Sequence, residues 1–154
     1  MTARRYWLMK SEPATYSIDD LRKDGTAGWD GVRNYQARNH MRGMKKGDLA
    51  LFYHSSTSPS AIVGVAEVAR EAYPDPTQFD PKNAHYDPGS PRDKPRWLQV
   101  DVRFKQAFPK PLTLDEARRL PALKDMVLLK RGRLSVQPVT AAEWECIQER
   151  CSHA

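Results

Sequence analysis

The sequence predicts an α+β fold, in which a small, strongly bent mixed β-sheet or β-barrel carries short helices around its rim. Short strand-like segments alternate with short helical segments, in an order too irregular for repeated β-α-β winding. The chain has 154 residues, the length of one ordinary domain, and no internal repeat or linker divides it. We therefore expect residues 1–154 to form a single domain.

A short strand over residues 6–9 is followed by a short helix. The strand consists of aromatic and aliphatic residues and stops at a Ser-Glu-Pro turn. Ser17 and Asp20 have the spacing of a capping box, in which each side chain accepts a hydrogen bond from the other residue's backbone N–H. They predict a helix over residues 18–23, and Gly25 favours its end.

A second helix is predicted from Asn34, a preferred N-cap residue, to about residue 42, with Gly43 as its stop. Two sets of side chains recur on it at helical spacing. The apolar set is expected to pack inward: Ala37, Met41 and Met44. The other set is expected to face outward: Tyr35, Arg38 and Arg42.

Three further strands are predicted at residues 48–54, 61–69 and 97–104. Apolar side chains occupy every second position of the last one, which indicates a strand with one buried face and one exposed face. Gly64 lies inside the β-branched strand 61–69 and suggests a bulge or a bend.

Residues 74–96 carry six prolines, so neither a helix nor a strand can persist there. A connection of this length inside one domain is uncommon, and is either a functional lid or binding loop or a rigid surface excursion. The sequence leaves these two alternatives open.

The C-terminal part reads as helices separated by one short strand. Two capping boxes, Thr113 with Glu116 and Thr140 with Glu143, predict the starts of two helices. A third helical stretch covers residues 123–129 between them. Residues 130–138 then read as a basic turn that leads into a short strand.

Composition limits the partners and cofactors. The net charge of +6 favours a polyanionic partner, although charge alone is a weak indication. Apolar runs such as residues 49–53 are too short to cross a membrane, and no secretory signal is evident, so we expect a cytoplasmic protein without a membrane partner. Cys146 and Cys151 lie five residues apart in a predicted helix, and no other residues complete a zinc site. We expect no metal and no other cofactor.

The run WDGVRNYQAR at residues 29–38 is the most informative motif. It sets two aromatic rings, two guanidinium groups and two amides around a glycine turn, which suits a flat heterocycle with a face to stack on and an edge to read. Between Gly31 and Gly47 there are five Lys or Arg residues and no carboxylate, which suits a phosphate-bearing partner. The alternative is that the aromatic residues fill a core and the cations are merely solvated.

Several motifs in order resemble the EVE domain family: YWLMKSEP at 6–13, WDGVRNYQARN at 29–39, FYHS at 52–55, YDP at 86–88, PRW at 95–97 and RLSVQP at 133–138. The resemblance extends over about residues 6–149. It implies a PUA-like fold and the binding of modified bases, chiefly modified cytosines in DNA.

The candidate base-binding residues supply rings, hydrogen-bonding groups and apolar wall. Trp29, Tyr35 and Tyr53 are the candidate stacking rings, since stacking on an aromatic ring contributes about 1–3 kcal/mol per base. Glu12 could accept a hydrogen bond from the cytosine amino group. Asn34 is a helix cap, a base reader or both. The full set is Lys10, Ser11, Glu12, Trp29, Val32, Arg33, Asn34, Tyr35, Phe52, Tyr53, His54, Ser135 and Gln137.

The candidate phosphate-binding residues are the cations that follow or oppose this motif. Arg131 and Arg133 flank Gly132 and form either a phosphate clamp or a solvated turn. The complete set is Arg38, Arg42, Lys45, Arg131 and Arg133.

These residues predict a non-catalytic, monomeric reader of nucleic acid that takes a flipped modified base, most readily a modified cytosine in DNA, into an aromatic and polar pocket. The first alternative is an RNA-binding PUA-like module. An enzyme acting on modified nucleotides is the second. His54 and Ser55 are adjacent on a strand and point to opposite faces, so they cannot act as a nucleophile and its base.

Overall fold

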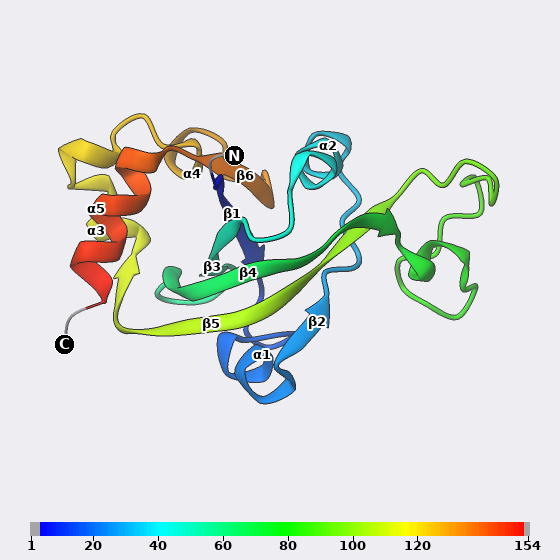
Figure 1. The fold of residues 1–154 in the computed structure, drawn as a ribbon, viewed down its shortest axis with the longest axis horizontal. Coiled ribbons are helices and arrows are strands. Elements are labelled where there is room, and N and C mark those ends of the chain that lie inside the picture. Colours follow the sequence, from blue (N-terminus) through cyan, green and yellow to red (C-terminus); the bar gives the residue numbers. More distant parts are fainter. Residues whose placement is uncertain (1–3, 153–154) are drawn as a thin grey trace.

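Six strands form one mixed sheet in the order β2-β5-β4-β3-β1-β6 in a computed structural model that describes residues 4–152 (Figure 1). Only β1 and β3 pair in parallel; the other neighbours are antiparallel. The strands are β1 (Tyr6–Ser11), β2 (Thr26–Gly28), β3 (Leu49–His54), β4 (Ala61–Pro74), β5 (Leu98–Thr113) and β6 (Val136–Val139).

The predicted caps start the helices where the sequence placed them. Ser17, Thr113 and Thr140 form complete capping boxes, and the Asn34 side chain accepts a hydrogen bond from the backbone N–H of Ala37. The stretch predicted at 123–129 is divided into a short 3-10 helix and a short α-helix. The helices are α1 (Ile18–Asp24), α2 (Tyr35–Gly43), η1 (Pro76–Phe79), α3 (Leu114–Arg118), η2 (Pro121–Leu123), α4 (Val127–Lys130) and α5 (Ala141–Cys151).

The sheet is buried on both faces, and it does not close into the expected barrel. Along β3, Leu49, Leu51 and Tyr53 belong to one hydrophobic core, whereas Ala50 and Phe52 belong to another. Helices α1 and α2 cover the face that carries Phe52, and α3, α4 and α5 cover the face that carries Leu51 (Figure 1). The short strands β2 and β6 lie at opposite edges of the sheet and do not pair with each other.

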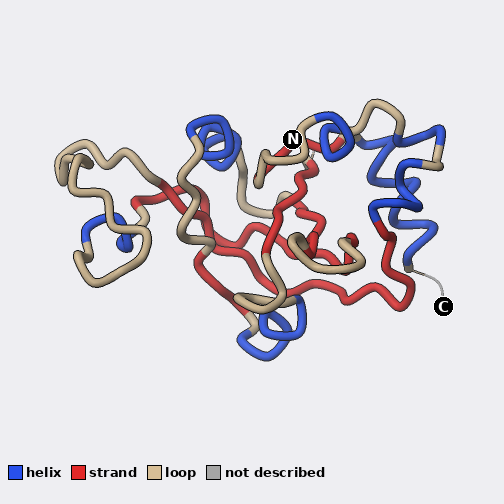
Figure 2. The backbone as a smooth tube through the Cα atoms, turned by 180° about the vertical axis from the view of Figure 1, so that it is seen from behind, coloured by secondary structure: helices blue, strands red, loops and turns tan. Residues whose placement is uncertain are grey.

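Strands β4 and β5 are much longer than predicted. They continue as an antiparallel ribbon beyond the helices, with Tyr73 paired to Gln99 and Pro74 to Leu98. The ribbon carries residues 75–97, which extend away from the body of the molecule (Figure 2). We call residues 75–97 the excursion.

Buried polar groups hold the base of the excursion. The amide nitrogen of Gln78 donates hydrogen bonds to the carbonyls of Asp75 and Trp97, and its amide oxygen accepts from the Ser90 hydroxyl and the Trp97 backbone N–H. Asp75 and Gln78 are fully buried. Satisfied buried polar networks favour one arrangement of the chain. The excursion is therefore a built element of the fold.

Candidate functional site

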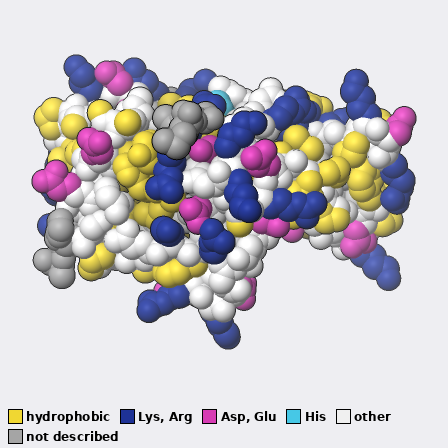
Figure 3. Space-filling model, viewed as in Figure 1, with side chains coloured by type: hydrophobic (Ala, Val, Ile, Leu, Met, Phe, Trp, Pro, Cys, Tyr) yellow, Lys and Arg dark blue, Asp and Glu magenta, His cyan; other side chains and the backbone are white. Residues whose placement is uncertain are grey.

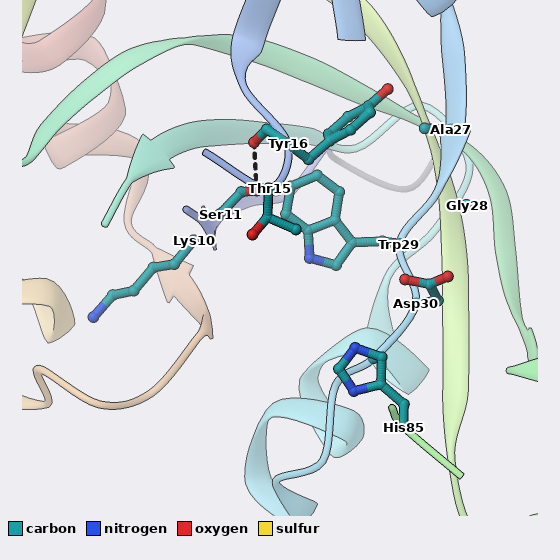
Figure 4. Close-up of a pocket in the computed structure, with 10 residues that line it drawn as sticks. Lys10, Ser11, Thr15, Tyr16, Ala27, Gly28, Trp29, Asp30 and His85 are labelled. Atoms are coloured by element: carbon teal, nitrogen blue, oxygen red, sulfur yellow. Dashed lines mark hydrogen bonds between the residues drawn. The ribbon is translucent and has the colours of Figure 1, made fainter. Parts of the chain in front are cut away.

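A cavity of about 410 Å³ opens where β1 ends, within the size range of small-molecule sites (Figure 4). Its walls come from the end of β1, the turn before α1, the segment around β2 that leads toward α2, and the excursion. The lining residues are Lys10, Ser11, Thr15, Tyr16, Ala27, Gly28, Trp29, Asp30, Gly31 and His85.

Trp29 forms one wall of the cavity. Its side chain is 9% exposed, and its ring meets Phe52 behind it at a centroid distance of 5.4 Å with the planes 86° apart. The indole nitrogen points toward the cavity (Figure 4), and no group among residues 4–152 accepts a hydrogen bond from it. Trp29 therefore presents both an aromatic surface and a free N–H donor to whatever enters.

The part of the wall at the end of β1 is held by hydrogen bonds to backbone carbonyls. The Ser11 hydroxyl donates a hydrogen bond to the Tyr16 carbonyl at 2.6 Å, and the Lys10 ammonium donates to the Gly132 carbonyl. Burial lowers the pKa of Lys10. Lys10 thus connects the cavity to the loop that carries Arg131 and Arg133.

The floor of the cavity is a glycine turn covered by an imidazole. Gly31 has a φ of +79°, and a Cβ placed there would lie 2.7 Å from Nε2 of His85. The adjacent Asp30 carboxylate accepts no hydrogen bond from another residue of the described part of the chain, and its own backbone N–H is its internal donor. Burial, and then the Asp75 carboxylate nearby, raise the pKa of Asp30.

Arg33 was expected to contact a phosphate or a base edge, but its guanidinium is committed elsewhere. Its five N–H donors go to the carbonyls of Val32 and His85, the hydroxyl of Thr77 and the carboxylate of Asp75. An arginine has no further donor. Arg33 therefore anchors the excursion.

Tyr35 lies outside the cavity lining and contacts the excursion. Its ring stacks on Trp97 at 4.9 Å and lies under the Arg38 guanidinium at 4.8 Å, yet it remains 53% exposed. Its neighbours Asn34, which caps α2, and Val32, which is buried in the core, do not line the cavity either.

Tyr53 offers no ring to the cavity, contrary to the expectation. It is 3% exposed and packs in the hydrophobic core on the other face of the sheet, whereas Phe52 lies behind Trp29. His54 accepts a hydrogen bond at Nε2 from the Ile18 backbone N–H at 3.0 Å, and burial lowers its pKa. His54 therefore supports the start of α1.

The remaining base-binding candidates also lie outside the lining. Glu12 is exposed, and its backbone carbonyl closes the turn before α1. The Ser135 carbonyl accepts from the Lys10 backbone N–H. Gln137 is fully buried, pairs with Leu8 and donates to the Leu134 carbonyl. Of the predicted base-binding set, the structure brings together Lys10, Ser11 and Trp29 at the cavity.

The predicted phosphate-binding residues form no single cluster. Arg131 donates a hydrogen bond to the Gln36 side chain at 2.6 Å and so links its loop to α2 beside the cavity. Arg38 donates to the Arg96 carbonyl. Arg42 and Arg133 are exposed and form no ion pair among residues 4–152.

Lys45 lies apart from the cavity in a second hollow. This hollow has a volume of about 480 Å³ and includes Arg4, Arg5 and Lys46 among its lining residues. Lys and Arg side chains also gather across the middle of the face shown in Figure 3. The cationic surface is therefore broader than the predicted set.

Sequence reasoning missed most of the lining. Asp30 and Gly31 fall inside the motif that was singled out, and their polar edge and turn were available signals. Thr15 and Tyr16 follow the Ser-Glu-Pro turn of the first motif. His85 gave no usable signal, because only the fold of the excursion brings it onto the turn.

Two negative findings concern the described residues. Within residues 4–152, no three His, Cys, Asp or Glu side chains come together in a way that could bind a metal ion. No helix in that range combines the length and the apolar character needed to span a bilayer.

Comparison with known proteins identifies one family and close relatives. The family model of the EVE domain matches residues 5–150. Thymocyte nuclear protein 1 of Mus musculus is 46% identical over 161 residues, which cover 92% of this chain and 71% of the mouse protein.

Two solved structures superpose closely. A hypothetical protein from Leishmania major is 47% identical with a TM-score of 0.93, over 96% of this chain and 94% of that chain. The human THYN1 protein in complex with 5-methylcytosine-containing DNA is 42% identical with a TM-score of 0.92, over 95% of this chain and 96% of that chain.

Proposed function

The chain belongs to the EVE domain family, and from that premise we propose that it is a non-catalytic reader of DNA that takes one flipped, modified cytosine into the cavity beside Trp29. One protein molecule binds one modified base. This role requires no catalytic residues, because the protein recognises the base by stacking, hydrogen bonds and shape.

The cavity beside Trp29 is the observation that carries the proposal. A base inside a duplex hides its faces, so a protein that reads a small modification has to extrude the base at a cost of a few kcal/mol. An aromatic wall, a free indole N–H and the Asp30 carboxylate at one opening supply the stacking and edge contacts that offset this cost.

The proposed identity of the base is supported by one relative. The human THYN1 protein has been solved with 5-methylcytosine-containing DNA, and it shares 42% of its residues with this chain at a TM-score of 0.92. A modified cytosine in DNA is thus the ligand that the comparison supports best.

A titration with matched duplexes tests the proposal. Two DNA duplexes differ in one 5-methyl group, and a single-stranded RNA of the same sequence serves as the third probe. A buried methyl group contributes about 0.8 kcal/mol, so we expect the methylated duplex to bind several-fold more tightly. Equal affinity for both duplexes, or a preference for the RNA, contradicts the proposal. Recovered DNA should retain its base unaltered.

Two tryptophan variants localise the effect. Trp29→Phe keeps an aromatic wall and removes the N–H donor, so the affinity for methylated DNA should fall by about 2- to 10-fold, the equivalent of one hydrogen bond. Trp144→Phe is the matched control, because Trp144 is 7% exposed and packs on the other face of the sheet. The control should bind as the wild type does.

A further inference from the structure

We infer that Asp30 determines the base specificity of the cavity by holding the amino edge of the flipped cytosine, with one proton shared between its carboxyl group and N3 of the base. The inference rests on the proposed function, since it assigns an acceptor to the same cavity.

Asp30 is placed for this role by its position and by its lack of partners. It is the one acidic residue among those that line the cavity, and its carboxyl group lies between Trp29 and His85 in Figure 4. No other residue of the described chain donates a hydrogen bond to its oxygens; the one internal donor is its own backbone N–H. Glu12, the carboxylate expected from the sequence to accept from cytosine, does not line the cavity.

The chemistry of cytosine requires a proton at this contact. The edge of the base carries an amino donor at N4 beside an acceptor at N3. An ionised carboxylate accepts from N4–H, but its second oxygen then faces the N3 lone pair. A protonated carboxyl group donates to N3 and accepts from N4–H, which gives two parallel hydrogen bonds.

The surroundings of Asp30 make the proton available. Asp30 is exposed, but its partial burial at the cavity and then the neighbouring Asp75 carboxylate raise its pKa, while His85, Arg33 and its own backbone N–H oppose the rise. Lys10 and Tyr16 are the other titratable groups that line the cavity. Binding of cytosine therefore takes up a proton from solution, and its affinity increases as the pH falls.

Substitution of Asp30 distinguishes the effect of its carboxyl group on the pH dependence of binding from the effects of the other titratable groups. Asp30→Asn keeps an acceptor for N4–H and supplies a permanent N–H donor for N3. Between pH 8 and pH 6, the affinity of the wild type for 5-methylcytosine DNA should rise with decreasing pH, and that of Asp30→Asn should rise less. The variant retains His85, so the difference between the two slopes belongs to Asp30. At pH 8 the Asn variant should bind at least as tightly as the wild type.

Asp30→Ala removes both hydrogen bonds and should weaken binding at least about fivefold, since a bidentate base contact contributes about 1–3 kcal/mol. Thermal unfolding of each variant checks that the fold is intact. The inference is overturned if Asp30→Ala binds as the wild type does, or if Asp30→Asn keeps the full pH slope. Wild-type preference for methylated DNA at pH 7.5 is measured alongside. Its absence would overturn the proposed function instead.

Discussion

Arg33 and Asp75 form an ion pair, with NH1 3.0 Å from Oδ2, in which the Asp75 side chain is fully buried. The same oxygen accepts a hydrogen bond from the Gly31 backbone N–H at 2.8 Å. Although burial opposes its ionisation, hydrogen bonds from Thr77, Gly31 and Arg33 hold the pKa of Asp75 below its ordinary value. One carboxylate thus ties the excursion to the turn that floors the cavity.

Arg33→Ala should destabilise the protein by about 3 kcal/mol or more, because removal of one partner leaves the other charge buried without compensation. Urea unfolding at pH 7 measures the change. Arg133→Ala removes an exposed guanidinium without an ion pair in the described chain and serves as the control. Similar unfolding free energies for the two variants would show that the pair does not hold the excursion.

Gly31→Ala should destabilise the protein more than Gly25→Ala does. The two glycines have almost the same φ, +79° and +81°, so the backbone strain of the substitution is matched. A Cβ at residue 31 meets the His85 ring at 2.7 Å, whereas a Cβ at residue 25 meets nothing within 4 Å. The difference in unfolding free energy isolates the contact with His85.

A second substitution checks that interpretation. His85→Ala opens the space above residue 31. Gly31→Ala should therefore lower the free energy of unfolding less in the His85→Ala variant than in the wild type. If the double variant is as unstable as the sum of the two single variants, the imidazole does not press on the turn.

The free energy of unfolding should decrease as the pH falls from 7.5 to 5. Burial lowers the pKa of His54 in the folded protein below its ordinary 6.5, although Asp19 opposes the shift. The unfolded chain therefore binds the proton more tightly. The loss of stability begins as the pH falls through 6.5 and is complete once the pH is below the folded-state pKa.

His54→Gln tests this assignment, because the glutamine oxygen can still accept from the Ile18 N–H while the titrating group is gone. The variant should lose part of the pH dependence in urea titrations at pH 7.5 and 5. Burial also lowers the pKa of His40, with the same sign, so His40→Gln should remove a further part. An unchanged slope in His54→Gln would contradict the assignment.

Arg42→Ala and Arg133→Ala should weaken the binding of methylated and plain DNA alike. Each exposed cation that contacts a phosphate releases about one counterion, so each substitution should lower the slope of log K against log salt by about one unit. Lys124→Ala, an exposed cation beside η2 on the other face of the sheet, is the control. An unchanged slope in the Arg variants would exclude those residues from the DNA contact.

Local signals in the sequence predicted the local structure. Ser17, Asn34 and Thr140 cap helices through hydrogen bonds to residues three positions away, so a short window of sequence contains the whole interaction. Strand β2 was not predicted, and strands β4 and β5 were predicted too short. Their polar residues pair with strands distant in sequence and bury little apolar surface, so a short window of sequence gives no signal.

Part of the site was predicted as well, because some of its residues lie in short local motifs. Trp29 and Ser11 belong to motifs that the chain itself places at the end of β1 and before α2. Tyr53 was expected to be a stacking ring, but alternation along a strand buried on both sides does not say which side borders the cavity. Arg33 was expected at a ligand because its partner Asp75 lies 42 residues away in sequence.

The most direct measurement follows the methyl group itself. A duplex with one ¹³C-methyl 5-methylcytosine is saturated with the protein, and nuclear Overhauser effects from that methyl are recorded. We expect contacts to the indole protons of Trp29 and the loss of contacts to the neighbouring bases. A methyl group that keeps its contacts within the duplex, and gains none to Trp29, would contradict the claim that the base enters this cavity.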